Sequence, residues 1–137
     1  MLVASLALQL LFAHPDPTTP DWVSRDRSYY EFFVQLQSAI RRGDRKAVAN
    51  LSAVPLRVNL AGDRFAMYRS RREIERDYHY IFSPQVRRAI LRQRPEKLWG
   101  RDQGVTTELG DIWFDHQCLD GACKRLGAVR IRSVNRL

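Results

Sequence analysis

The stretch Gly104–Asn135, GVTTELGDIWFDHQCLDGACKRLGAVRIRSVN, carries the strongest fold signal in the chain. Two apolar runs, Ile112–Phe114 and Val129–Ile131, flank the loop Cys118–Cys123, whose Asp-Gly pair is a strong signal for a tight turn. Cysteines on either side of the short tip LDGA face each other across an antiparallel pair, at a separation that a disulfide can bridge. The stretch therefore predicts a disulfide-closed hairpin at the edge of a curved sheet, with upstream helices covering that sheet.

The size and composition of the chain predict one domain. At 137 residues it can build one ordinary hydrophobic core but not two. With 45% hydrophobic residues and no low-complexity run, it differs from disordered segments. We therefore expect all the motifs below to belong to a single fold.

An apolar segment precedes that domain. Met1–Ala13 carries no charge, and the proline-rich residues 14–20 that follow cannot continue a helix. The segment is too short to span a bilayer and matches the apolar region of a secretory signal; the alternative is an N-terminal helix packed on the domain. We divide the chain into a signal-like segment (1–13), a linker (14–24) and a single domain (25–137), and expect a periplasmic or secreted protein.

The two cysteines agree with export, because disulfides form and persist in oxidising compartments. A disulfide that closes so short a loop would add about 2 kcal/mol to the stability. Free thiols in a cytosolic protein are the alternative. Asp115 and His116 lie just before Cys118, which suggests a metal site. No metal site is expected, however, because C-x4-C with one histidine matches no standard zinc pattern.

The chain is strongly basic, with a formal net charge of +8. All of its 23 basic residues except Lys46, Lys97 and Lys124 are arginine. Arginine favours planar, multidentate contacts with phosphate or carboxylate. The alternative is a solvated surface on which arginine has replaced lysine.

Capping signals and helical periodicity predict helices on both sides of one early strand. Ser28–Glu31 is a capping box before an apolar stripe that ends at Gly43, and Asp44 can cap a shorter second helix. Ser70–Glu73 is a second capping box, and Ser83-Pro84 opens a further helix that stops at Arg94-Pro95. The positions expected to face the core are Tyr29, Phe33, Leu36, Ile40, Ala47, Val48, Leu51, Ile74, Tyr78, Ile81, Val86, Ala89 and Ile90.

Period-two alternation predicts the strands. Leu56–Leu60 alternates apolar and polar residues, as expected for a half-buried strand that begins near Pro55, and Ala61–Asp63 then turns the chain out again. Residues 98–107 are expected as a strand interrupted near Gly100, ahead of the hairpin. Helices before antiparallel strands predict an α+β fold, a curved antiparallel sheet packed by N-terminal and central helices.

Three motifs carry a resemblance to a known family. Pro55-Leu-Arg-Val-Asn59 follows the helix pair, Tyr80-Ile-Phe-Ser-Pro84 lies between helices, and Gly104-Val precedes Gly110-Asp-Ile-Trp-Phe114. In these motifs and in the order of its elements, the chain resembles the nuclear transport factor 2-like (cystatin-like) superfamily over roughly residues 25–136, and looks closest to small exported bacterial members without an assigned activity. The resemblance implies a cone in which a curved sheet wraps a long helix and leaves a pocket at the open end.

The resemblance implies no single function, because this scaffold hosts isomerases, cyclases, dehydratases and binding modules. In its enzymes a pocket Asp or His acts as general base, and a Tyr or an acid polarises the substrate carbonyl. No such pair falls on a matching position of this sequence. The resemblance therefore favours binding over catalysis here.

The strand around Trp113 supplies most candidate site residues. Ile112 and Phe114 point one way, whereas Asp111, Trp113 and Asp115 point the other. If the aliphatic side is core, Trp113 faces solvent or a pocket mouth; if Trp113 faces the helices, Asp111 and Asp115 become catalytic candidates with a tyrosine as electrophilic donor. The candidate ligand-binding residues are Trp99, Trp113 and Tyr78.

One predicted helix presents a basic face. Arg87, Arg88 and Arg92 lie on it without an acidic neighbour, so they are candidate anion-binding residues that could touch phospholipid head groups, or simply a solvated face. No recognised motif organises arginines and aromatic residues for nucleic acid, which is not an expected partner. No phosphate loop, nucleophile elbow or zinc-hydrolase motif occurs, so no cofactor is expected.

These observations predict an exported binding domain that is not a catalyst. It would hold a small apolar ligand or a protein partner at the mouth of the cone. One alternative is a cofactor-free isomerase or dehydratase that uses Asp111 or Asp115 as base. Another is an arginine-mediated binder of anionic surfaces such as a membrane, and a homodimer is natural for the resembled fold.

Overall fold

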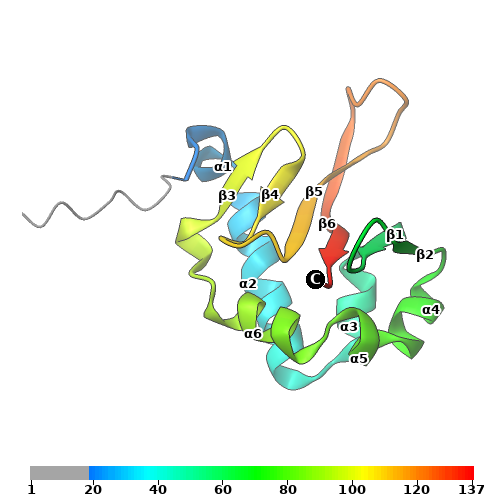
Figure 1. Ribbon diagram of the computed structural model, residues 1–137. Helices are drawn as coiled ribbons and strands as arrows, with labels where there is room; N and C mark the ends of the chain where they lie inside the picture. The colour runs from blue at the N-terminus through cyan, green and yellow to red at the C-terminus, as the bar shows by residue number, and fades with distance from the viewer. Residues whose placement is uncertain (1–18) are drawn as a thin grey trace, which may run out of the picture.

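The computed structural model describes residues 19–137, which form a layer of helices against one face of a six-stranded sheet (Figure 1). The predicted α+β class is confirmed. The signal-like segment and the first residues of the predicted linker lie outside the described residues. The strands follow the order β2-β1-β6-β5-β4-β3 across the sheet, and their bounds are β1 Ser52–Asn59, β2 Phe65–Tyr68, β3 Trp99–Arg101, β4 Gly104–Thr106, β5 Ile112–Cys118 and β6 Leu126–Asn135.

The helices differ greatly in length, and the longest one, α2 (Arg27–Arg42), packs along the sheet (Figure 1). A short helix, α1 (Asp21–Arg25), occupies the end of the segment predicted as linker. None of the helices in the described part of the chain is long and apolar enough to cross a membrane. The others are α3 Arg45–Asn50, α4 Arg71–Arg76, α5 Tyr78–Ile81, α6 Pro84–Arg92 and the 3-10 helix η1 Pro95–Lys97.

The sheet is mixed, which corrects the expectation of an antiparallel sheet. β3 to β6 form an antiparallel meander, but β1 lies parallel to β6. The register between β1 and β6 shifts between Ser52 and Arg57, so Pro55, which has no N–H to donate, lies at an irregular point of the ladder. The strand pattern predicted the alternating part of β1, but β1 begins at Ser52, so Pro55 lies inside the strand and not at its start. The neighbour of β1 was not predicted, because alternation encodes a buried face and not the direction of the partner strand.

A second strand, β2, follows β1 where the chain was expected to leave the sheet. Gly62 adopts a positive φ of 72° in the turn, and the chain returns antiparallel to β1 with Arg57 opposite Met67. The four residues of β2 are too few for alternation to stand out. This hairpin forms one edge of the sheet.

The N-terminus of α2 begins differently from the prediction. Asp26, not Ser28, is the N-cap, and its carboxylate accepts a hydrogen bond of 3.0 Å from the Ser28 backbone N–H. Glu31 does not reach back to the cap; it lies 3.9 Å from Arg27 on the solvent side. Aspartate and serine are equally good caps, so the two candidates could not be separated by residue preference.

The other predicted helix ends are confirmed. Gly43 ends α2 in the left-handed conformation, with φ 64°, and Asp44 caps α3 through the Ala47 N–H. Ser70 and Ser83 cap α4 and α6 in the same way. The single helix expected after Ser70 is broken at residue 77 into α4 and α5.

The core lies between α2 and the sheet. Phe33 stacks on Phe114 of β5 with ring centroids 5.8 Å apart, and Phe32 lies 5.1 Å from the same ring. Phe82 is fully buried as well. Aromatic rings thus fill the space between α2 and the sheet.

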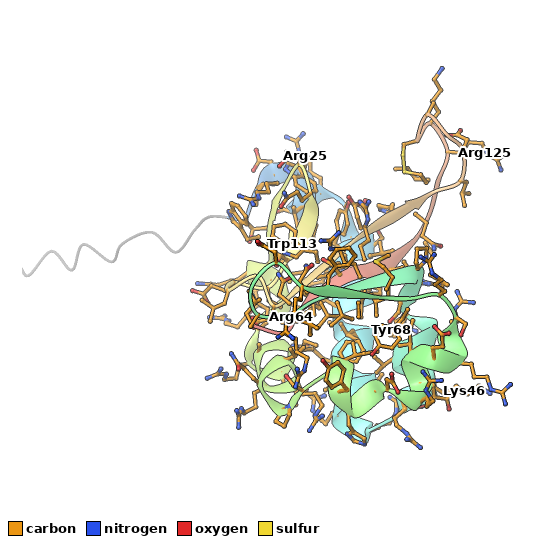
Figure 2. All side chains as sticks on the ribbon, turned by 45° about the vertical axis from the view of Figure 1, so that its right-hand side comes forward. Arg25, Lys46, Arg64, Tyr68, Trp113 and Arg125 are labelled. Carbon is orange, nitrogen blue, oxygen red and sulfur yellow. A yellow bond between two sulfur atoms is a disulfide. The ribbon has the colours of Figure 1, made fainter. Side chains whose placement is uncertain are left out.

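The predicted hairpin and its disulfide are confirmed, but β5 and β6 are the two central strands of the sheet, so the hairpin does not lie at the edge as expected. The cysteines do not face each other in the strand pairing either, because Cys118 lies opposite Leu126 and Cys123 belongs to the loop. β5 and β6 pair antiparallel, and a disulfide joins Cys118 to Cys123 with their Cα atoms 4.7 Å apart. The hairpin runs well beyond the rest of the fold (Figures 1 and 2). Ile112 and Phe114 are buried, so the aliphatic side of β5 is the core side and Trp113 points to the opposite face.

Candidate functional site

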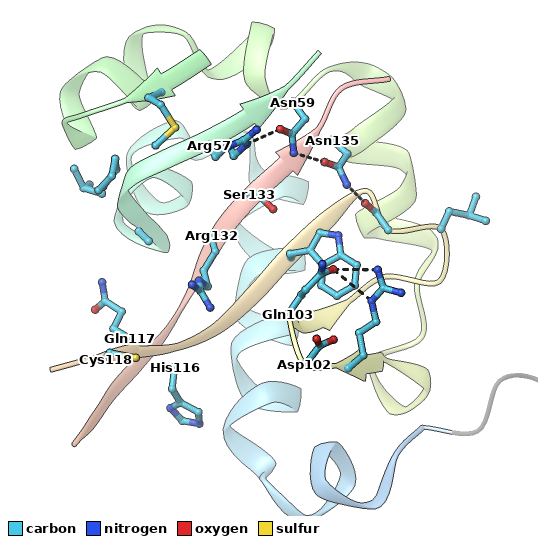
Figure 3. Close-up of a pocket in the computed structure, with 18 residues that line it drawn as sticks. Arg57, Asn59, Asp102, Gln103, His116, Gln117, Cys118, Arg132, Ser133 and Asn135 are labelled. Atoms are coloured by element: carbon cyan, nitrogen blue, oxygen red, sulfur yellow. Dashed lines mark hydrogen bonds between the residues drawn. The ribbon is translucent and has the colours of Figure 1, made fainter. Parts of the chain in front are cut away.

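The face of the sheet opposite the core holds an open groove of about 1050 Å³ (Figure 3). Alternation along the strands builds it. Leu56 and Val58 of β1 point into the core, so Arg57 points outward, and Trp113 points outward from β5 for the same reason. The turn between β3 and β4 adds further polar side chains to the lining.

The lining of this groove is cationic. Arg57, Arg101 and Arg132 come from three different strands and all line it. Among the described residues of the lining, Asp102 alone carries a carboxylate (Figure 3). Asp102 is exposed, in the turn after β3. The groove therefore has an excess of positive charge at neutral pH.

Two of these arginines are held by aromatic rings and neutral acceptors. The Arg57 guanidinium lies 3.9 Å from the centroid of the Phe65 ring and donates from Nε to Asn59 Oδ1 at 2.7 Å. The Arg101 guanidinium lies 5.5 Å from the Trp113 centroid and donates to a side-chain carbonyl in the β3–β4 turn. Rings and amides position a guanidinium without neutralising it.

Arg132 is exposed on β6 and points into the groove (Figure 3). Its side chain forms no hydrogen bond, ion pair or ring contact with any of residues 19–137. Within this part of the chain, all five of its N–H donors therefore remain available to a ligand.

A chain of amides fixes one end of the groove. Asn59 Nδ2 donates to Asn135 Oδ1 at 2.8 Å, and Asn135 Nδ2 donates to the Gly110 carbonyl at 2.6 Å (Figure 3). These bonds tie β1, β6 and the loop before β5 together. The end of the groove is thus rigid and polar.

His116 lines the opposite end of the groove and connects this end to the start of α2. Its Nδ1 donates to the Gly127 carbonyl at 2.8 Å, and its Nε2 lies 2.7 Å from Asp26 Oδ2 and 3.0 Å from Ser28 Oγ. Burial disfavours the imidazolium, but the bonds to Gly127 and Asp26 outweigh it and raise the pKa of His116. Burial also opposes the charge on Asp26, yet the bonds from Ser28 and His116 lower the pKa of that carboxyl.

This arrangement contains a serine, a histidine and an aspartate but is not a nucleophilic triad. In a triad the base contacts serine through one ring nitrogen and the orienting acid through the other. Here Ser28 and Asp26 share Nε2, and Ser28 Oγ also donates to the Asp26 carboxylate. Nδ1 is bonded to the Gly127 carbonyl and Nε2 faces the Asp26 carboxylate, so neither ring nitrogen is free to accept the serine proton. The cluster therefore joins α2 to β5 and does not activate a nucleophile.

Asp115 and Asp111, the catalytic candidates of the sequence, do not line the groove. Asp115 accepts from the Tyr29 hydroxyl at 2.6 Å and from the His116 N–H at 2.7 Å. Burial and the neighbouring carboxylate raise the pKa of Tyr29. Asp111 forms side-chain and backbone bonds with Thr107 in the turn before β5. The structure does not bring the two carboxylates to a common ligand surface.

Of the three candidate ligand-binding residues, two lie at or near the groove and one lies in the core. Trp113 lines the groove, and Trp99 lies beneath the Arg101 guanidinium with its ring centroid 5.7 Å away. Tyr78 is only 2% exposed and stacks on Phe82 in the core, so it does not reach a surface ligand.

The predicted anion-binding arginines form a different surface. Arg87 is half-buried and donates to the Phe82 carbonyl at 2.6 Å, whereas Arg88 and Arg92 are exposed on α6, a helix that packs against α2. The groove arginines were not predicted. The polar positions of the alternating strands, Arg57 and Arg132, were the signal that could have identified them.

No group of His, Cys, Asp and Glu side chains within residues 19–137 could hold a metal ion. No family model matches the chain, and no curated protein or solved structure matches it either. The likeness to the nuclear transport factor 2-like superfamily therefore stays a prediction from the sequence motifs.

Proposed function

We propose that this chain is a non-catalytic binding domain whose open groove takes a small ligand that combines an anionic group with a flat apolar part. The observation that carries the proposal is the position of Arg132 beside Trp113, without a partner among residues 19–137, in a lining with three arginines and one carboxylate. The proposal keeps the binding role expected from the sequence. It moves the site from the mouth of a cone to the open face of the sheet.

The chemistry of the lining supports this ligand class. A guanidinium binds a carboxylate or phosphate through two parallel hydrogen bonds, and the indole of Trp113 offers a flat surface for stacking. Ligand sites commonly measure about 300–1,000 Å³, and the groove, at about 1050 Å³, is just above that range. Arg57 and Arg101 raise the local positive potential on both sides of the anion.

Self-association through the same face is less favourable. A two-fold dimer places the same residues of both copies against each other. Across this face it would bring together two sets of the arginines Arg57, Arg101 and Arg132 with only Asp102 to compensate them. An anionic ligand relieves that repulsion, whereas a second copy increases it.

Catalysis has less support than binding. The Asp115 carboxylate is engaged by Tyr29, and Asp111 by Thr107, and neither lines the groove. The alternative of an isomerase or dehydratase based on these residues has no matching geometry to carry it. The disulfide between Cys118 and Cys123 supports export to an oxidising compartment, which is part of the proposal.

Calorimetric titration of the full chain tests the ligand class with three probes. 2-Naphthoate carries both the anion and the flat ring, 2-naphthamide has the ring alone, and acetate has the anion alone. We expect naphthoate to bind at least about tenfold more tightly than either of the others, because only it uses both Arg132 and Trp113.

Variants locate the binding. Arg132→Gln should weaken naphthoate binding about tenfold or more, since a charge-assisted bidentate contact is lost. Arg88→Gln removes the same charge from α6 and should leave the affinity unchanged. Equal affinities for naphthoate and naphthamide, or equal losses in the two variants, would show that the groove is not an anion site.

A further inference from the structure

We propose that the tip of the β5–β6 hairpin, Cys118–Leu126, docks the protein onto bilayers that contain anionic phospholipid. The tip is separate from the groove lining apart from Cys118, and the inference does not depend on the proposed ligand. The hairpin carries the tip away from the helices and from the rest of the sheet (Figures 1 and 2). A surface that projects in this way can touch a membrane before any other part of the fold does.

Two leucines make the tip apolar. Leu119 and Leu126 are 56% and 58% exposed, although each is large and aliphatic. Cys118 pairs with Leu126, and the Leu119 N–H donates to the Arg125 carbonyl at 2.8 Å. Because successive pairs of a ribbon point to opposite faces, the two leucines lie on opposite faces of the tip.

The position of the two leucines on opposite faces of the tip favours a lipid bilayer over a protein as the binding partner. A flat partner would cover one face of the tip and leave one leucine in water. Head groups that surround the tip end-on would cover both leucines. In addition, a stable protein interface involves roughly 20–30 residues a side, far more than this tip presents.

The charges of the tip match an anionic lipid. Lys124 and Arg125 are exposed, and neither forms an ion pair with another described residue. The single acidic residue, Asp120, uses its two carboxylate oxygens to accept from the Lys124 and Arg125 backbone N–H groups at 2.9 and 3.1 Å. Leucines at the acyl boundary with cations at the phosphates are the usual arrangement of interfacial anchors.

The tip is rigid before it binds. The disulfide closes it, and the Asp120 bonds fix the turn. Leu119 packs over Gly127, where a Cβ would lie only 2.9 Å from the leucine Cδ2. Docking therefore does not have to order a loop, which would weaken binding.

Protection of the disulfide reports the position of the tip. The full chain is mixed with vesicles of phosphatidylcholine, alone or with phosphatidylglycerol, and the Cys118–Cys123 bond is reduced with a water-soluble phosphine. Free thiols are counted by alkylation and mass. We expect the mixed vesicles to slow the reduction about fivefold or more and the neutral vesicles to slow it less.

Matched variants complete the test. Leu119→Ser with Leu126→Ser, and Lys124→Gln with Arg125→Gln, should each abolish the protection. Leu137→Ser, an exposed leucine at the other end of β6, and Arg88→Gln with Arg92→Gln should leave it unchanged. All chains share residues 1–18, so any lipid affinity of that segment is the same in each.

Reduction that is equally fast with and without anionic vesicles overturns the proposal. So does protection that is lost in the α6 variant and kept in both tip variants, because the basic helix face would then hold the chain on the membrane. Circular dichroism of every variant verifies that the fold is retained, as expected for substitutions of exposed side chains.

Discussion

Arg87 and Arg132 show how the partners of a side chain decide its role. Arg87 donates to the Phe82 carbonyl and is half-buried, so its guanidinium stabilises the connection between α5 and α6. Arg132 has the same chemical group but no partner within the described residues. Arg132 therefore keeps more donors for a bidentate contact with a ligand than Arg87, which already uses one N–H within the fold.

Tyr78 and Tyr29 give a matched pair of predictions with opposite sign. The Tyr78 hydroxyl is buried without a hydrogen-bond partner in the described structure, so Tyr78→Phe should raise the free energy of unfolding by about 1 kcal/mol. Tyr29→Phe removes the bond to Asp115 and should lower it by about 1.5 kcal/mol. Urea unfolding of both variants measures the difference, and a loss of stability in Tyr78→Phe would mean that its hydroxyl has a partner.

At the scale of elements, α1 and α2 are attached to the sheet by contacts at their ends. Trp22 of α1 packs edge-on against Tyr29 of α2, with ring centroids 6.0 Å apart, and also lies over Gly100 of β3. Asp26, between the two helices, contacts His116 of β5. The junction of the helices is therefore fixed to two strands.

The contact between α1 and β3 depends on the absence of a side chain at Gly100. A Cβ there would lie 2.8 Å from Trp22 ring atoms and from Val23 Cγ2. Gly100→Ala should displace α1, lower the free energy of unfolding by about 1 kcal/mol or more, and speed tryptic cleavage after Arg25.

Gly121→Ala is the control for this substitution. Its Cβ would meet nothing within 4 Å, and its φ is not in the left-handed range, so stability and cleavage should stay as in the wild type. Equal behaviour of the two alanine variants would show that α1 does not rest on β3. Proteolysis followed by mass measurement distinguishes the outcomes.

At the scale of the whole molecule, the helices and the sheet divide the chemistry between two faces. The core face is aromatic and aliphatic, and the open face is cationic and hydrogen-bonded. The cluster of Asp26, Ser28 and His116 joins the two layers at one end. The stability of the molecule should therefore depend on the charges of this cluster.

The pH dependence of that stability follows from the directions of the two pKa shifts. The folded pKa of His116 is raised above 6.5, so the contribution of its imidazolium is fully present below 6.5 and is lost as the pH rises through the folded pKa. The folded pKa of Asp26 is lowered below 3.8, so its contribution is present above 3.8 and is lost as the pH falls through the folded pKa. The two contributions coexist between these limits.

His116→Gln should remove the decline on the alkaline side, because glutamine does not titrate. Urea midpoints measured from about pH 4 to pH 9 test this, since the range covers the ordinary histidine pKa of about 6.5. An alkaline decline of the same size in the variant would assign it to other groups.

The sequence by itself determined the local structure of this protein. Gly43, Asp44 and Ser83 mark helix ends because capping depends on a few neighbouring residues. The Cys118–Cys123 hairpin and the inward side of β5 follow from turn chemistry and alternation, which are equally local. These predictions needed no knowledge of distant contacts.

Only the tertiary structure decided which surfaces come together. The parallel pairing of β1 with β6 places Arg57 next to Ser133, far away in the sequence, and so builds the groove. The same packing buries Tyr78 and bonds Asp115 to Tyr29, while Asp111 is bonded to Thr107. These three predicted site residues therefore do not reach the ligand surface. Periodicity reports which face of an element is buried, but which element covers that face depends on long-range packing that a local pattern does not encode.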